Sequence, residues 1–182
     1  PFWGWSQRAT GLRHDLTHSL HHLVTHTHTP QAVRGDLGSK TTRIIAEVLR
    51  LHRDNPAVKI IVFSQWGALL DIMAAGMSAN GVSHVRAGPK RLLTAAFQRF
   101  KTSADCTVLL LPLKLGGRGL NLVEATHIFL IEPLLSPELE LQAINRVHRI
   151  SQTRPTTVHH FVVMATVEER IVSIKAQKLK CG

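Results

Sequence analysis

Two kinds of apolar pattern alternate along most of this chain. Short apolar runs without polar alternation are typical of strands that are buried on both faces of a parallel sheet. Longer stretches with an apolar residue at every third or fourth position are typical of helices. The predicted strands are Lys59–Ser64, Val82–Arg86, Cys106–Leu113, Ile128–Ile131 and Thr157–Val163. The predicted helices are Ser39–Arg53, Gly67–Asn80, Lys90–Lys101, Leu139–Ile150 and a last one that begins at Thr166–Glu169.

The order of these elements indicates the fold class. Strand and helix alternate, which predicts an α/β fold with a doubly wound, mainly parallel sheet and helices on both of its faces. Ser39 is the expected N-cap of the first helix, and the TVEE stretch from Thr166 is typical of a capping box. In the last helix, Val167, Ile171 and Ile174 share one face. Because such sheets bind ligands beyond the carboxyl ends of their strands, we expect the functional site there.

Residues 1–38 differ from the rest of the chain. They hold half of the twelve histidines and two of the three tryptophans, and they show no convincing helical or strand period. The alternation of histidine and threonine at positions 26–29 is compatible with metal binding, but no spacing there defines a tetrahedral site. We therefore expect 1–38 to be an irregular, His-rich and poorly ordered leader, and 39–182 to form the folded domain.

Composition restricts the classes of function. With 182 residues, 44% of them hydrophobic, the chain is long enough for one globular domain. No apolar run reaches the roughly 18 residues of a membrane span and no signal-peptide pattern opens the chain, so we expect no membrane partner. The two cysteines exclude a zinc module built from CxxC pairs and fit a reducing compartment. The net charge of +10 favours a polyanionic partner, most often a nucleic acid.

A charged face on the helix predicted at Leu139–Ile150 is the first candidate site. At about 100° per residue, Gln142, Arg146 and Arg149 share one side of this helix, opposite an apolar stripe. An arginine guanidinium is a planar, permanently charged fork that matches phosphate oxygens, so this face suits a phosphate-rich ligand. A solvated face whose arginines pair with nearby glutamates remains the alternative.

A glycine-rich loop after the third predicted strand is the second candidate site. The stretch KLGGRGLN (114–121) has glycines at positions 116, 117 and 119, which let the backbone approach a ligand closely. Backbone amides in such a loop can bind phosphate, and Lys114 and Arg118 add positive charge. A tight strand-to-helix turn is the alternative interpretation. No P-loop pattern, G-x-x-x-x-G-K-[ST], occurs anywhere in the chain.

Several stretches resemble motifs of one enzyme family, the Swi/Snf-type ATPases of helicase superfamily two. QAINRVHRISQ (142–152) resembles the last helicase motif, Q-A-x-D-R-x-H-R-I-G-Q, and departs from it at Asn145 and Ser151. GGRGLNL is similar to the fifth motif, G-G-x-G-L-N-L, and KIIVFSQW resembles the fourth. This similarity implies the second, C-terminal lobe of a two-lobed, RecA-like ATPase. A buried strand with polar residues at its end is the alternative interpretation of KIIVFSQW.

A further stretch, EPLLSPELELQA, is similar to the family pattern D-P-x-W-N-P-x-x-E-x-Q-A. The departures are Glu132, Leu135 and Ser136. With this stretch included, the resemblance extends from about Ser39 to Glu169.

The resemblance also implies roles for individual residues. Arg146 and Arg149 would be the arginine fingers that contact the γ-phosphate of ATP, with Gln142 beside them. The residues expected at the nucleotide are Gly116, Gly117, Gly119 and Asn121. Those expected at DNA are Ser64, Gln65, Trp66, Lys114 and Arg118, and charge alone adds Arg86 and Lys90. The implied cofactor is ATP with Mg²⁺, whose metal ion the absent N-terminal lobe would mainly hold, so this chain would be inactive alone.

Partners and location follow from the same resemblance. It implies double-stranded or nucleosomal DNA, an N-terminal helicase lobe and a nuclear location. The stretches VLLLPL, IEPLLSP, ELQAINRVHRISQT and ATVEERI are similar to a branch of the family that combines the ATPase with ubiquitin-ligase modules. That branch implies a role in DNA damage tolerance, with the sliding clamp PCNA and ubiquitin-conjugating enzymes as partners of the parent protein.

Two alternatives to this interpretation come from other classes of protein. One is a non-catalytic DNA- or protein-binding module derived from such a lobe. The other is a nucleotide-binding metabolic enzyme, which is disfavoured because the chain has no GxGxxG fingerprint and no catalytic carboxylate pair.

Overall fold

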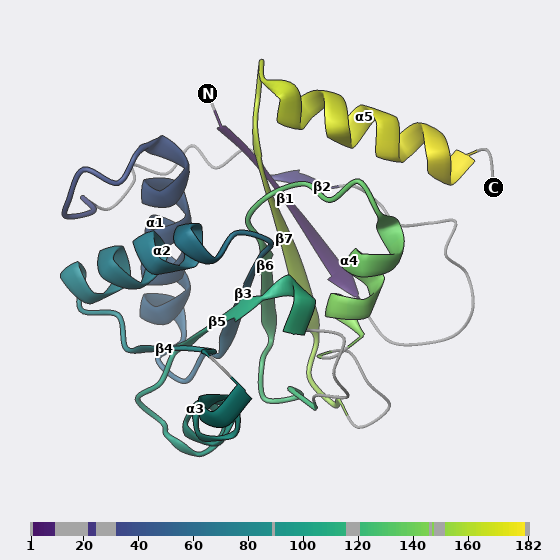
Figure 1. Ribbon diagram of the computed structural model, residues 1–182. Helices are drawn as coiled ribbons and strands as arrows, with labels where there is room; N and C mark the ends of the chain where they lie inside the picture. Colours follow the sequence, from purple (N-terminus) through teal and green to yellow (C-terminus); the bar gives the residue numbers. More distant parts are fainter. Residues whose placement is uncertain are drawn as a thin grey trace.

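The computed structural model of the protein describes residues 2–9, 22–24, 32–88, 90–115, 121–145, 147 and 152–180 (Figure 1). The strands among these residues form one sheet in the order β2-β1-β7-β6-β3-β5-β4. The parallel part of the sheet comprises β3 (Ile60–Ser64), β4 (His84–Arg86), β5 (Val108–Pro112), β6 (His127–Leu130) and β7 (Thr156–Val163). The helices are α1 (Ser39–Asp54), α2 (Gly67–Ala79), α3 (Lys90–Thr102), α4 (Pro137–Ile144) and α5 (Val167–Lys180), with a short 3₁₀ turn, η1, at Leu113–Leu115.

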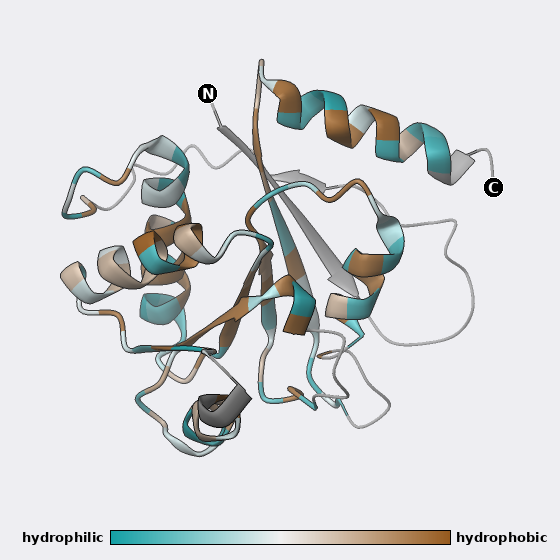
Figure 2. Cartoon of the chain, viewed as in Figure 1, coloured by the Kyte–Doolittle hydropathy of each residue, from teal (hydrophilic) through white to brown (hydrophobic). Residues whose placement is uncertain are grey.

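Alternate side chains of the central strand β3 face two separate cores. Ile60 and Val62 pack with α1 and α2, whereas Ile61 and Phe63 pack with α3 and α4. Successive side chains of a strand point to opposite faces, so helices on both sides bury every residue of β3. Figure 2 shows these apolar strands between the helices. The prediction of a doubly wound α/β fold with helices on both faces is therefore confirmed.

The start of α1 differs from the prediction in one detail. Gly38, with a φ of +71°, is the N-cap, and no side chain caps the helix. The predicted N-cap, Ser39, is instead the first helical residue. A glycine adopts this left-handed backbone conformation without the steric cost that a Cβ atom would add.

The helix α4 is shorter than predicted. It ends at Ile144 with Asn145 as its C-cap, whereas the apolar periodicity predicted a continuous helix over Leu139–Ile150. The amide of Val147 then donates to the carbonyl of Ile144 at 3.0 Å, so the chain tightens into a turn. Asparagine is a poor helix former because its side chain competes for backbone hydrogen bonds. Arg146 and Arg149 lie outside the described residues, so the face that was predicted to carry them together with Gln142 stays a prediction.

Residues 1–38 contribute two strands, although the sequence showed no strand period there. β1 (Phe2–Ala9) pairs antiparallel with β7, and β2 (His22–Val24) pairs with β1. Pairing at the edge of a sheet is made by backbone groups and does not require apolar alternation in the side chains. The division of the chain at residue 38 stays a prediction.

The last helix, α5, is not held by an apolar stripe. Thr166 caps it as predicted, because its hydroxyl accepts the amide of Glu168 at 3.2 Å. Val167 and Ile174, however, are 69% and 39% exposed. Polar contacts of Glu168 and Lys175 connect α5 to α1 and α4 instead. Within the described ranges, no helix is both long and apolar enough to cross a membrane.

Candidate functional site at the carboxyl ends of β3 and β6

β3 and β6 are neighbours in the sheet, but the chain leaves them toward opposite faces. After β3 it enters α2 on one face, and after β6 it enters α4 on the other (Figure 1). Such a topological switch point is where open α/β sheets bind ligands. The turns that follow these two strands contain several of the predicted site residues.

Glu132 joins the turns that follow β3 and β6. Its Oε1 accepts a hydrogen bond from Ser64 Oγ at 3.0 Å and another from the backbone amide of Gln65. Ser64 Oγ in turn accepts the amide of Trp66 at 2.9 Å. The two strands pair in register up to Phe63, so Gln65 comes to lie beside Glu132 just beyond their ends. A carboxylate that follows β6 therefore organises the turn that follows β3.

The carboxyl group of Glu132 is shielded from solvent, and its pKa is raised. Burial raises the pKa above its ordinary value, while hydrogen bonds from Gln65 and Ser64 and the charge of Lys40 oppose this shift. The second carboxyl oxygen, Oε2, is buried and has no hydrogen-bond partner among the described residues. Lys40 is itself paired with Glu168 at 2.7 Å. Only one oxygen of Glu132 thus has partners that offset its desolvation.

The side chains next to this turn are accessible. Trp66 is 65% exposed and Gln65 is also exposed, whereas Ser64 is buried. Lys114 is exposed in η1, directly after β5. β5 pairs with β3 so that Pro112 lies opposite Ser64, which puts Lys114 at the same edge of the sheet. An exposed indole and an ammonium group at this edge offer an aromatic surface and a positive charge to a polyanionic ligand.

Two further predicted site residues are described, and both are exposed. Gln142 lies on α4, and Asn121 lies in the segment that leads to β6. In the described part of the chain, neither side chain bonds to the turn around Glu132. The remaining predicted site residues lie outside the described residues: Arg146, Arg149, Gly116, Gly117, Gly119 and Arg118.

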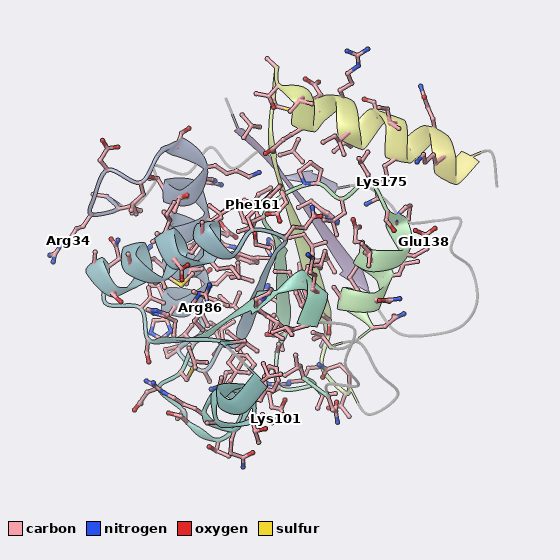
Figure 3. The ribbon with its side chains drawn as sticks, viewed as in Figure 1. Arg34, Arg86, Lys101, Glu138, Phe161 and Lys175 are labelled. Carbon is pink, nitrogen blue, oxygen red and sulfur yellow. The ribbon has the colours of Figure 1, made fainter. Side chains whose placement is uncertain are left out.

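Arg86, which charge alone suggested as a DNA contact, has partners within the protein. It forms an ion pair with Asp71 at 2.7 Å and donates to the carbonyl of Gly67 at 3.2 Å (Figure 3). These contacts connect β4 to the first two turns of α2. A role of Arg86 at DNA stays a prediction, as does one of Lys90, whose side chain lies outside the described residues.

Gln152 and Arg154 have a positioning role that the sequence did not indicate. Gln152 Nε2 donates to the carbonyls of Val123 at 2.8 Å and Ala125 at 3.0 Å. Arg154 donates to the carbonyl of Glu124 at 2.6 Å. The last residue of the QAINRVHRISQ stretch thus holds the segment between the glycine-rich loop and β6. A polar residue at the end of a motif gives no sign of which backbone carbonyls it binds.

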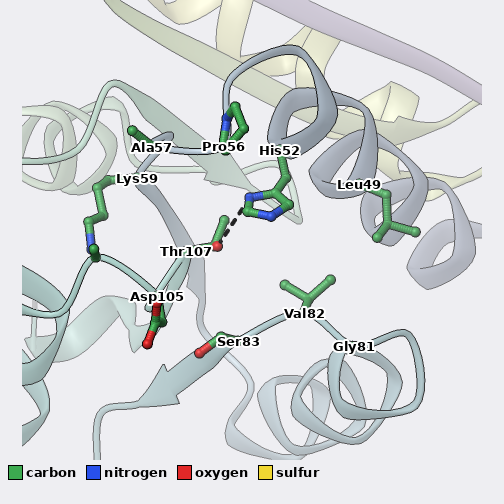
Figure 4. A pocket seen from close by; sticks show the side chains of 11 residues that line it. Leu49, His52, Pro56, Ala57, Lys59, Gly81, Val82, Ser83, Asp105 and Thr107 are labelled. Atoms are coloured by element: carbon green, nitrogen blue, oxygen red, sulfur yellow. Dashed lines mark hydrogen bonds between the residues drawn. The ribbon is translucent and has the colours of Figure 1, made fainter.

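A depression of about 620 Å³ lies at the opposite, amino edge of the sheet (Figure 4). His52, Lys59 and Thr107 are among the residues that line it. His52 Nδ1 lies 3.4 Å from Thr107 Oγ1, and Lys59 Nζ donates to the carbonyl of Cys106 at 2.7 Å. None of the predicted site residues lines this depression, and its histidine and lysine bond to the protein itself.

Comparisons with known proteins agree on one family. Residues 40–151 match the family described as the helicase conserved C-terminal domain. The chain is 39% identical over 139 residues to the human E3 ubiquitin-protein ligase SHPRH. It is 40% identical over 140 residues to the helicase-like transcription factor CHR27 of Arabidopsis thaliana. It is also 33% identical over 142 residues to the DNA repair protein rad8 of Schizosaccharomyces pombe.

These relatives are much longer than the matched region. The alignments cover 76%, 74% and 76% of this chain, but only 8%, 13% and 12% of SHPRH, CHR27 and rad8. Among solved structures, the C-terminal part of the Fun30 ATPase domain is similar, with a TM-score of 0.72 and 22% identity. That match covers 79% of this chain and 48% of the other. At such identity the likeness concerns the RecA-like α/β fold.

Proposed function

Because this chain belongs to the family of helicase conserved C-terminal domains, we propose that it works as the second lobe of an ATP-dependent DNA translocase. The relatives confirm the resemblance to Swi/Snf-type ATPases, including the ubiquitin-ligase branch. The observation that carries the proposal is the switch point between β3 and β6. Ser64, Gln65 and Trp66 lie there, and Lys114 follows the neighbouring strand at the same edge.

We assign DNA contacts to this edge. The exposed Trp66 provides an aromatic surface, and Lys114 and Arg118 provide charge for phosphates. The net charge of +10 predicts that affinity for DNA falls steeply as salt rises, because each neutralised phosphate releases counterions. Ser64 is buried and supports the turn, so Gln65 and Trp66 are the members of the motif that reach DNA.

We assign the ATP contacts to Arg146 and Arg149, with Gln142 near them and Gly116, Gly117, Gly119 and Asn121 at the nucleotide. An arginine aimed at the γ-phosphate stabilises the charge that develops there during transfer, an effect worth about 10³–10⁵ in rate. The described residues contain no group of three or more His, Cys, Asp or Glu side chains that could hold a metal ion. We propose that the N-terminal lobe mainly holds Mg²⁺, while this chain supplies the guanidinium groups of Arg146 and Arg149.

Reconstitution tests the proposal. The chain would be mixed with the N-terminal helicase lobe of the human relative SHPRH, and ATP turnover would be measured with and without double-stranded DNA. We expect turnover to require both lobes and to fall by about 10³-fold or more in Arg146→Ala. Arg149→Lys should have a similar effect, because lysine keeps the charge but loses the bidentate fork.

The matched control for these variants is Arg170→Ala, which removes an exposed arginine of α5 and should leave turnover unchanged. Turnover by the chain alone that survives in Arg146→Ala would contradict the assignment of half an ATP site.

The relatives, which include an E3 ubiquitin-protein ligase and a DNA repair protein, suggest the wider partners that we propose. We propose a nuclear parent protein that acts on double-stranded or nucleosomal DNA during damage tolerance. PCNA and ubiquitin-conjugating enzymes would be partners of that parent.

A second candidate function is a non-catalytic module that binds DNA or protein. The departures at Asn145, Ser151 and Leu135 favour it, because they fall in the two stretches nearest to the proposed ATP contacts. Salt-sensitive DNA binding by the chain, combined with no turnover in the presence of the N-terminal lobe, would support this module over the ATPase.

A further inference from the structure

The exposed Trp66 lies at the end of a chain of hydrogen bonds that begins at Glu132. The amide of Trp66 donates to Ser64 Oγ, and the Ser64 hydroxyl donates to Glu132 Oε1. The amide of Gln65 donates to the same carboxylate oxygen. All three residues of the turn therefore depend on one acceptor that is 68 residues away in sequence from Ser64.

The indole of Trp66 is unusually accessible for its residue type. It is 65% exposed, although tryptophan is among the residues that are buried most on average. Trp66 is also the N-cap of α2, and its side chain makes no capping hydrogen bond. Its place is therefore set through the backbone of the turn rather than by packing in a core.

The carboxylate of Glu132 needs an explanation at an edge that we assign to DNA. A negative charge there repels phosphates, and its burial costs free energy. The observed geometry turns its Oε1 toward the protein, where it accepts two hydrogen bonds from the turn. We therefore infer that the free-energy cost of burying Glu132 is offset by the hydrogen bonds that fix the conformation of Ser64–Trp66.

We propose that Glu132 is a positioning residue, which holds the Ser64–Trp66 turn and so presents the Trp66 indole for stacking against nucleic acid. This inference rests on the proposed DNA-binding function and deepens it. Neither the family match nor the relatives assign a role to Glu132, which replaces the aspartate of the family pattern.

Two charged side chains on other elements face Glu132. Lys40 on α1 lowers the pKa of Glu132 and Glu168 on α5 raises it, while burial has the largest effect and raises it. Because an ionised acceptor forms stronger hydrogen bonds than a neutral one, protonation of Glu132 weakens its hold on the turn. The position of Trp66 is therefore expected to respond to pH.

The first test observes Trp66 directly in the full chain. Labelling with ¹⁵N-tryptophan gives three indole N–H resonances, because the chain has three tryptophans, and Trp66→Phe identifies the one of Trp66. We expect this resonance to titrate in the wild type and to lose that response in Glu132→Gln. In Glu168→Gln the response should remain but move to lower pH, because Glu168 raises the pKa of Glu132.

The second test measures the affinity for a fluorescein-labelled DNA duplex with a single-stranded end. We expect Trp66→Ala and Glu132→Ala each to weaken binding about tenfold, and the double variant to be no weaker than Trp66→Ala. The charge control is Glu138→Gln, which removes a negative charge from exposed α4 surface and should not weaken binding. In the double variant of Glu132→Ala and Lys114→Ala, the fold-losses in DNA affinity of the two single variants should multiply, because Lys114 contacts DNA independently of the turn.

The outcomes separate this inference from the proposed function. If the Trp66 resonance titrates unchanged in Glu132→Gln, or if the losses of Glu132→Ala and Trp66→Ala multiply, the positioning role is wrong. If the wild type does not bind DNA although the resonance depends on Glu132, the positioning of Trp66 holds and the DNA-binding function fails. Should Glu132→Ala not fold, the near-isosteric Glu132→Gln still decides through the loss of the pH response.

Discussion

Two glutamates of this protein are withdrawn from water, and their surroundings have opposite effects on them. Glu132 follows β6 and has partners on one carboxyl oxygen only. Glu140 on α4 has a partner on each oxygen: His160 Nε2 lies 2.9 Å from Oε1, and Lys175 Nζ, on the labelled side chain of α5 in Figure 3, bonds to Oε2. Burial raises the pKa of Glu132, whereas at Glu140 the bonds and charges of His160 and Lys175 outweigh burial and lower it.

We interpret Glu140 as a structural contact, and we propose that Glu132 serves the candidate site. Glu140 connects α4 to β7 and α5, because its two carboxyl oxygens bond to His160 and Lys175. Glu132 retains an unsatisfied oxygen at the switch point of the sheet, where its other oxygen shapes an exposed turn. The raised pKa of a partly satisfied carboxyl group at this edge supports the proposal that Glu132 serves the candidate site.

The largest effect on stability is expected when Glu140 is replaced. Glu140→Gln leaves the Lys175 ammonium group and His160 without their anionic partner. We expect it to reduce the free energy of unfolding by roughly 2–4 kcal/mol, because breaking a buried ion pair leaves an uncompensated charge. Urea denaturation followed by circular dichroism measures the loss. The control is Glu138→Gln on the exposed side of the same helix, and an equal effect of both variants would remove the distinction that we draw for Glu140.

The histidine beside this cluster should make the β7 region sensitive to acid. His159 lies 2.9 Å from His127 Nδ1, and burial lowers the pKa of His159 to about 3. The unfolded chain takes up this proton near the ordinary pKa of 6.5, so folding stability falls as the pH drops from there toward about 3. His159→Gln keeps a hydrogen-bonding side chain and cannot titrate, so its stability should depend less on pH across that window. Parallel pH profiles of the two proteins, from urea denaturation at each pH, would contradict the expectation.

The ion pair between Lys40 and Glu168 should contribute less to the free energy of unfolding than the contacts of Glu140 do. Lys40→Met removes the partner of Glu168 at side chains that are 19% and 22% exposed, and we expect a loss of about 1 kcal/mol. Hydrogen exchange should then increase at the first turn of α5 and not in α1. The same change should raise the pKa of Glu132 further, because Lys40 lowers it. A resonance of Trp66 that titrates at an unchanged pH in Lys40→Met would argue against this coupling.

The smallest effect on stability is expected at Glu132 itself. Glu132→Gln should change the free energy of unfolding by less than about 1 kcal/mol, because it removes a costly buried charge and keeps an acceptor oxygen. The pH dependence should have the opposite sign to that of Glu140. A raised pKa means that the folded state binds the proton more tightly, so mild acid stabilises the wild type relative to Glu132→Gln. A loss as large as that of Glu140→Gln would show that both carboxylates are structural.

Most of the fold could be predicted, and the reason differs between the centre and the edge of the sheet. β3 and β5 are covered on both faces, so burial is visible as the apolar runs IIVFS and VLLLP. β1 joins the sheet at β7 through backbone pairing, which leaves no comparable pattern in the side chains. The end of α4 was missed because the apolar period continues past Asn145 while the helix does not.

The candidate site could be predicted in part. Ser64, Gln65 and Trp66 were identified from a motif, and they lie at the end of a buried strand; their role at DNA stays a prediction. Glu132 was noticed only as a departure from the family pattern. Its bonds to the turn could not be inferred, because they depend on which strands are neighbours and on their register.

The sequence by itself determined the order of strands and helices, the membership of the helicase family and the residue types at the carboxyl edge. Those features can be inferred from the pattern of apolar residues, which indicates burial, and from motifs made of residues that are adjacent in the sequence. Tertiary structure alone decided which polar groups meet. Glu132 is 68 residues from Ser64 and Glu140 is 35 residues from Lys175, so their partners are set by the packing of distant elements. The chemical character of a glutamate in this protein is therefore a property of the fold around it.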